Sequence, residues 1–207
     1  MNEKKLILAA KILSTIFSPF YTPIWVLLGL FLFSYLKMLP FSYKLFILSM
    51  VYIFTILIPR ACISMFKHIN RQTNIQLSSR EHRHLPYILT LISYTVCFIL
   101  MTRFNVPMFF KGIVMAALVA QIICVMVNAW WKISTHMVGI GGLTGALLAF
   151  SSLFYFNPVI PACVLIIIAG ALGTSRIILR QHSVSQVAVG FFVGLVCSMV
   201  FILKDWM

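Results

Sequence analysis

Seven long apolar runs, separated by short basic or polar segments, dominate this chain. Each run is close to the ~20 residues that a helix needs to cross a bilayer. Backbone polar groups inside a bilayer must be satisfied within the protein, so such runs form helices or barrel strands. These runs are apolar on all sides and do not alternate, which predicts helices. The expected spans are Ile12–Leu36, Tyr43–Phe66, Leu85–Thr102, Met108–Trp131, Met137–Tyr155, Val159–Thr174 and Val184–Leu203.

Only 9% of the residues are charged and 62% are hydrophobic, whereas a soluble domain carries about 25% charged residues. No soluble domain, long linker or low-complexity tract interrupts the spans. We therefore predict an all-α polytopic transmembrane helix bundle with six or seven spans, forming one integral membrane domain over residues 1–207. Residues 1–79 would supply two N-terminal spans and a polar loop. The glycine pairs Gly141/Gly145 and Gly190/Gly194 predict close helix packing within the chain.

The charge balance is strongly basic, with 16 Lys and Arg against three acids, Glu3, Glu81 and Asp205. The basic residues lie at span ends, which favours membrane lipids and a phosphorylated lipid as partners over nucleic acid. We expect no soluble protein partner. The shortage of carboxylates argues against hard-cation chemistry, and the five cysteines match no zinc spacing. We therefore expect neither a metal nor a cofactor.

Three polar clusters lie between the spans, at Lys67–His84, Lys132–His136 and Ser175–His182. Two spans separate the first cluster from the second, and two more separate the second from the third. An even number of crossings returns the chain to the same face, so the clusters are expected to converge there. The converging residues would be Arg80, Arg83, Lys132, Ser134, His136, Arg176 and His182, together with His82 and His84.

These side chains suit phosphoryl transfer. Arginine forks match phosphate oxygens and stabilise charge on the transferring group. Two histidines can divide the work, one as a nucleophile that takes the phosphoryl group on nitrogen and the other as the acid for the leaving oxygen. Taken singly, each cluster also has a structural interpretation as span-end lysine, capping hydroxyl or cytoplasmic basic residues.

In their order, the clusters resemble the motifs of the type 2 phosphatidic acid phosphatase superfamily, which shares its fold with vanadium haloperoxidases. The family pattern is K-x6-R-P, then P-S-G-H, then S-R-x5-H-x3-D. The third motif matches at Ser175, Arg176 and His182. The second matches in part, with Ser134 and His136 in place but Ile133 for Pro and Thr135 for Gly. The first is only suggested, by Arg80-x2-Arg83-x2-Pro86. The resemblance covers about residues 80–207.

The resemblance implies that His182 is the nucleophile, that His136 is the acid, and that Arg176 and Ser134 bind phosphate. Arg80 and Arg83 are candidates for the cations of the first motif, and Lys132 is added on charge and proximity alone. One departure is Gln186, which stands where the family has an aspartate. Its amide oxygen can orient the imidazole of His182 but cannot supply the negative charge.

We therefore expect a metal-independent lipid phosphate or diphosphate phosphatase. Gln186 motivates one alternative, a family member that binds lipid phosphate without turnover. The basic face and glycine-rich spans motivate another, a small transporter or channel. The expected location is the bacterial cytoplasmic membrane. The site-bearing face holds more Lys and Arg than the other face, but the excess disappears without the cluster residues, so either sidedness is compatible with the sequence.

Overall fold

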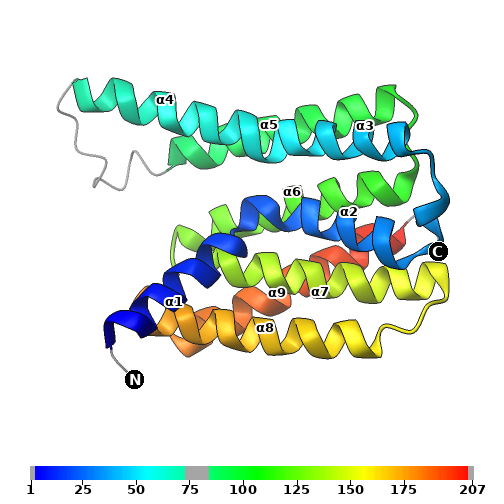
Figure 1. The fold of residues 1–207 in the computed structure, drawn as a ribbon. Helices are drawn as coiled ribbons and strands as arrows, with labels where there is room; N and C mark the ends of the chain where they lie inside the picture. Colours follow the sequence, from blue (N-terminus) through cyan, green and yellow to red (C-terminus); the bar gives the residue numbers. More distant parts are fainter. Residues whose placement is uncertain (1–2, 73–83, 205–207) are drawn as a thin grey trace.

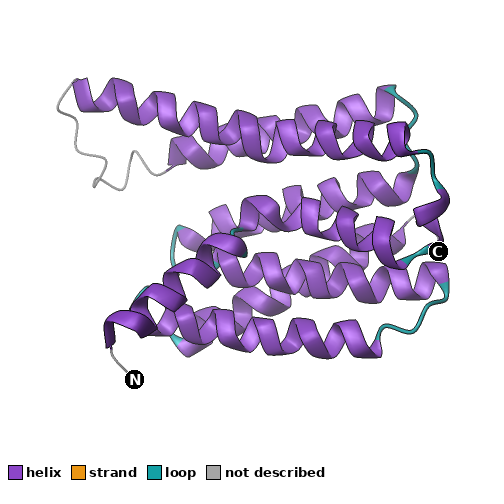
Figure 2. Cartoon of the chain, in the orientation of Figure 1, coloured by secondary structure: helices purple, strands orange, loops and turns teal. Residues whose placement is uncertain are grey.

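The computed structural model describes residues 3–72 and 84–204, and this part of the chain consists of helices and the turns between them (Figure 2). The bounds are α1 Glu3–Ile16, η1 Pro19–Tyr21, α2 Thr22–Phe33, η2 Tyr35–Met38, α3 Phe41–Tyr52, η3 Ile53–Leu57, α4 Ile58–Gln72, α5 His84–Arg103, α6 Met108–Asn128, α7 Thr135–Phe154, α8 Val159–Ile178 and α9 Val184–Leu203.

Six helical stretches in the described residues are long and apolar enough to cross a membrane: Glu3–Phe33, Phe41–Met65, Met108–Asn128, Thr135–Phe154, Val159–Ile178 and Val184–Leu203. Ile88–Arg103 of α5 is a shorter apolar helix. Large apolar side chains such as Phe33, Ile160 and Ile167 are exposed on the outside of the bundle, as lipid contact requires. The predicted all-α, multi-pass membrane bundle is confirmed.

The first span is not the single helix predicted over Ile12–Leu36. The helix breaks after Ile16, because Ser18 is extended (φ −64°, ψ 141°) and prolines follow at positions 19 and 23. Proline lacks the N–H that would continue the helical ladder. α1 therefore turns away to pack on α8, whereas α2 packs on α7 (Figure 1).

The second span contains a π-helical turn, η3, between α3 and α4. Pro59 lies just beyond this turn, and its missing N–H frees a carbonyl one turn earlier. The Ser93 hydroxyl of α5 donates to the Phe54 carbonyl at 2.5 Å, so a neighbouring helix supplies a hydrogen bond where the ladder is irregular.

Of the described helices, α7 and α9 make the most extensive contact with one another. The predicted spacing of glycines explains this close packing. A Cβ at Gly141, Gly145 or Gly194 would collide with a backbone carbonyl of the opposite helix, and one at Gly190 would lie 2.7 Å from the Ser134 carbonyl oxygen. The glycines thus serve packing within the chain, as expected. Because both helices begin at the same end of the bundle, this contact also fixes their N-termini side by side (Figure 1).

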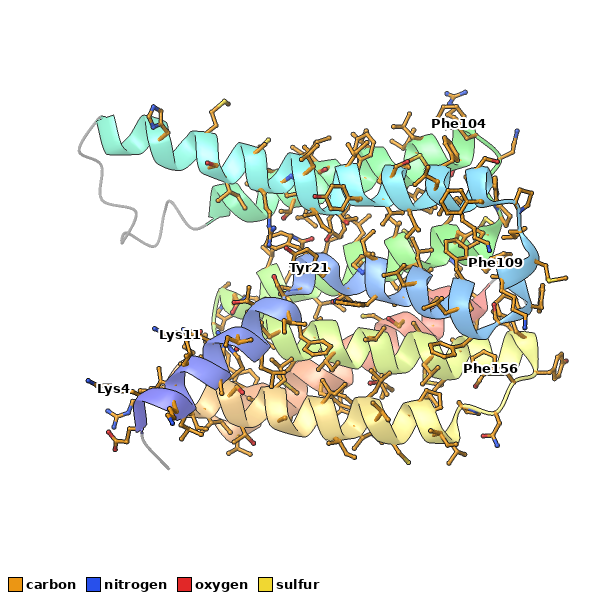
Figure 3. The ribbon with its side chains drawn as sticks, viewed as in Figure 1. Lys4, Lys11, Tyr21, Phe104, Phe109 and Phe156 are labelled. Atoms are coloured by element: carbon orange, nitrogen blue, oxygen red, sulfur yellow. The ribbon has the colours of Figure 1, made fainter. Side chains whose placement is uncertain are left out.

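The main apolar core lies toward the end of the bundle where α6 begins. Phe110 and Phe150 are almost fully buried there, and Phe31 lies against Phe110 with ring centroids 5.8 Å apart. Figure 3 shows Phe109 and Phe156 at this end and Lys11 at the opposite end. The opposite end of the bundle, with Lys11, is here called the basic end, and it is the more polar of the two ends.

Candidate active site

Two of the three polar clusters meet at the basic end of the bundle. His136 lies in the first turn of α7, Arg176 in the last turn of α8 and His182 between α8 and α9. His136 lies close enough to Arg176 and His182 to interact electrostatically with both side chains. The crossing count predicted this meeting. Arg80 and Arg83, with Glu81 and His82, lie outside the described residues.

The turn from α8 to α9 is closed by backbone hydrogen bonds. The Gln181 N–H donates to the Arg176 carbonyl at 3.1 Å, and the Arg180 N–H donates to the Ile177 carbonyl at 2.8 Å. With Arg180 left-handed at φ 52°, this is a Schellman-type helix end. It folds Gln181 back so that its side-chain oxygen accepts a hydrogen bond from the Arg176 guanidinium.

The hydrogen bonds of Gln186 determine which nitrogen of His182 carries hydrogen. Ser183 and Gln186 form a capping box at the start of α9, in which the Ser183 N–H donates to Gln186 Oε1 at 3.1 Å. A backbone N–H can only donate, so the amide must present its oxygen. The same oxygen lies 3.2 Å from His182 Nδ1. Nδ1 therefore carries the hydrogen, which leaves the lone pair of the neutral ring on Nε2.

Three buried polar side-chain atoms at this end have no hydrogen-bond partner among the described residues: Arg176 Nε, Ser134 Oγ and Ser14 Oγ. Arg176 is 7% exposed and Ser134 is 0% exposed. Glu3, exposed in the first turn of α1, is the sole carboxylate of the described residues, and it does not pair with Arg176. A buried cation and unused donors are costly unless an anion joins them.

A polar cavity of about 430 Å³, here called the polar basin, opens at this end. Four different helices contribute to its wall, and no carboxylate of the described residues does. The lining residues are Lys11, Ser14, Thr15, Ser18, Arg60, His136, Arg176, Leu179 and Gln181. Lys132, Ser134 and His182 are not among the residues that line it.

His136 is held by α1. Because the Ser18 N–H donates to the Thr15 carbonyl, the Ser14 carbonyl at the end of α1 lacks its usual helical donor. The imidazole of His136 hydrogen-bonds this carbonyl. One ring nitrogen is thus occupied by the backbone of α1, and the other remains for a ligand in the basin.

Burial lowers the pKa of His182 below its usual value, and the nearby charges of Lys132 and Arg176 lower it further, against the opposing hydrogen bonds with the Gln186 side chain and the Lys132 backbone. His182 is therefore neutral at pH 7. Lys132 is exposed, and it acts on His182 through its charge, which lowers the pKa, and through a backbone hydrogen bond, which raises it.

Sequence reasoning predicted His136 and Arg176 but missed the other seven residues of the basin wall, Lys11, Ser14, Thr15, Ser18, Arg60, Leu179 and Gln181. Arg60 offered a signal, because it lies inside an apolar run where ionisable residues usually line a site. Its guanidinium carbon lies 4.8 Å from the ring centroid of Tyr21, a cation–π contact that ties α4 to η1. Figure 3 shows Tyr21 on η1, at the level between α1 and α4.

Comparisons with known proteins give no match: no family model, no curated protein and no solved structure is similar to this chain.

Proposed function

We propose that this chain is a membrane-embedded, metal-independent phosphatase that hydrolyses a lipid phosphate or diphosphate through a phosphohistidine intermediate. The observation that carries the proposal is the buried guanidinium of Arg176. Among the described residues, its Nε has no hydrogen-bond partner and no carboxylate neutralises its charge. A phosphate would supply both the negative charge and the acceptor oxygens.

The surrounding groups support the same ligand. The unpaired Ser134 and Ser14 hydroxyls can donate to phosphate oxygens, and the N-termini of α7 and α9 present positive dipole ends to this region. The resemblance to the type 2 phosphatidic acid phosphatase superfamily adds the roles of the two histidines.

In the first half of the reaction, the Nε2 lone pair of His182 attacks phosphorus and the bond from phosphorus to the lipid oxygen breaks. His136, protonated on its basin-facing nitrogen, gives that proton to the leaving oxygen. The products are N-phosphorylated His182 and a lipid alcohol, or a lipid monophosphate when the substrate is a diphosphate. Arg176 stabilises charge on the transferring group.

In the second half, water attacks phosphorus and the P–N bond breaks. Neutral His136 takes a proton from this water, which returns His136 to its starting state. Inorganic phosphate leaves, and the lone pair returns to Nε2 of His182. Gln186 keeps Nδ1 as the donor throughout, but its neutral amide does not offset the positive charge of the phosphorylated ring.

The test is phosphate release by the purified full-length protein from a panel of lipid phosphates, with a chelator present. We expect release that survives chelation, is abolished in His182→Ala and falls at least about a hundredfold in Arg176→Gln. Arg180→Gln is the matched control, because Arg180 is an exposed cation of the same turn. Full activity in His182→Ala would exclude the proposed mechanism.

A second candidate function is binding of lipid phosphate without turnover, and the neutral amide of Gln186 beside His182 favours it. This candidate predicts vanadate or lipid-phosphate binding by the parent without phosphate release, together with release after an acid is introduced at position 186.

A further inference from the structure

The polar basin adjoins a second cavity of about 310 Å³, which is lined by buried and half-buried residues and is partly open to the outside; it is here called the inner cavity. The two cavities share His136 and Ser18 in their walls. A group that reaches the basin through this shared boundary therefore passes the ring proposed to protonate the leaving oxygen.

The inner cavity runs along the helices into the bundle. On α7 its wall extends from His136 through Gly139 and Gly142 to Ala146, which lies ten positions after His136, or about 15 Å along the helix at 1.5 Å per residue. That is about half of a 30 Å hydrocarbon core. The other walls come from α2, α4, α5, α6 and α9.

Small side chains make the space. α6 lines it with Ala116, Ala117 and Ala120 at helical spacing, and α7 faces it with glycines and Ala146. The polar side chains in the wall include a pair that satisfies itself, since Gln121 donates to Thr90 across α6 and α5. This pair therefore does not require a polar group from a ligand. The lining of the cavity is otherwise mainly apolar.

We propose that the inner cavity binds the single hydrocarbon chain of a phosphorylated lipid, so that the enzyme selects single-chain lipids over diacyl lipids. This inference rests on the proposed function. The cavity starts at His136, where the phosphate-bearing end must lie, and its volume is at the lower end of the range for ligand pockets. A volume of about 310 Å³ has room for one hydrocarbon chain, whereas a diacyl lipid brings two.

A second possible binding position for the hydrocarbon chain lies on the outside of the bundle. A groove of about 800 Å³, here called the outer groove, lies between α2, α7 and α8 and is lined by Phe17, Trp25, Gly29, Leu147 and Leu165, among others. None of the basin residues lines it. Its exposed apolar surface fits ordinary lipid contact, and it supplies the control for the test.

The experiment uses the full-length protein with chelator and compares kcat/KM on a long single-chain phosphate, a short-chain phosphate and a diacyl phosphate. Ala117→Phe places a ring in the inner cavity. We expect the ratio of long-chain to short-chain kcat/KM to fall about tenfold or more. Gly29→Leu fills the outer groove without a clash, since a Cβ there meets no atom within 4 Å, and the ratio should be preserved.

A photo-crosslinkable group at the tail of the single-chain phosphate gives a readout on the unmutated protein. Adducts on α6 between residues 113 and 121 support the inner cavity, and adducts confined to Trp25 or Leu147 overturn it. Equal kcat/KM for single-chain and diacyl substrates would also overturn it. If the unmutated protein released phosphate from none of the substrates, the short-chain one included, this result would instead count against the proposed function.

Discussion

One oxygen atom of the Gln186 side chain makes two hydrogen bonds. It accepts from the Ser183 N–H, which caps α9, and from Nδ1 of His182. A glutamate would keep both hydrogen bonds, since glutamate also serves at this position of a capping box. It would add a negative charge beside His182, which the proposed phosphohistidine intermediate lacks with glutamine at this position.

We expect Gln186→Glu to raise kcat about tenfold or more, because a carboxylate stabilises positive charge on the ring that it orients. Steady-state kinetics on the best lipid phosphate would measure the change. Gln186→Ala is the companion variant and should lose both activity and about 1 kcal/mol of helix capping. An unchanged kcat in Gln186→Glu would show that position 186 does not act on His182.

The pH dependence of kcat/KM should report His182, whose pKa lies below its usual value because of burial and the charges of Lys132 and Arg176. Activity should fall as the pH drops and the ring becomes protonated. Lys132→Gln removes a positive charge that disfavours the imidazolium, so the pKa of His182 rises. The acid limb of the profile should therefore move to higher pH.

The control for this shift is Arg180→Gln, which removes a cation of the turn that does not perturb His182. Its acid limb should stay in place. A shift of the Lys132→Gln profile to lower pH would contradict the assignment.

At the scale of elements, the contact between α7 and α9 sets the site, because Ser134 and His136 begin one helix and His182 precedes the other. The Ser134 N–H also donates to the Gln186 carbonyl at 3.4 Å, which joins the two helix starts directly. Separation of these helices should therefore damage both stability and activity.

We expect Gly194→Ala to lower the free energy of unfolding by about 1–3 kcal/mol, because its Cβ would collide with the Val138 carbonyl. Thermal unfolding in detergent would measure this, and kcat should fall with it. Gly170→Ala on α8 is the matched control, because a Cβ there meets nothing within 4 Å. It should be neutral or stabilising by up to about 1 kcal/mol. Equal tolerance of both variants would refute this role of the contact.

At the scale of the whole molecule, the polar basin exists because segments distant in sequence fold over one end of the bundle. The break between α1 and α2 lets α1 lie on α8, which brings Lys11 and Ser14 to the basin, and α4 brings Arg60 from the other side. With Arg176, these residues form a cationic wall assembled from three helices.

We expect Lys11→Gln and Arg60→Gln each to raise KM for a lipid phosphate roughly tenfold, because each removes a cation from the wall of the proposed phosphate site. Lys4→Gln is the control, since Lys4 lies on α1 but outside the basin wall. KM values from initial rates would decide the matter. A KM raised equally by Lys4→Gln would show that net charge, and not the basin, attracts the substrate.

Hydropathy determined the class of fold from the sequence alone, because each helix that faces lipid must be apolar around its circumference wherever it sits in the bundle. Small-residue spacing determined the close packing of Gly141, Gly145 and Gly194, and counting crossings brought His136, Arg176 and His182 to one end. These inferences depend on the composition of each run, on the spacing of small residues and on whether the number of membrane crossings is even. All three are local or additive properties of a chain.

The tertiary structure alone decided which groups are buried without partners and which cations face them. Arg60 and Lys11 stood out little among other span-end cations, and the unpaired Nε of Arg176 depends on every neighbour at once. The break at residues 17–21 was missed because Phe17 and Phe20 continue the apolar run on either side of Ser18 and Pro19. The extended backbone of Ser18 and the prolines at positions 19 and 23 nevertheless end one helix and begin another. The inner cavity likewise depends on how alanines of α6 face glycines of α7, a lateral packing that no one-dimensional pattern records.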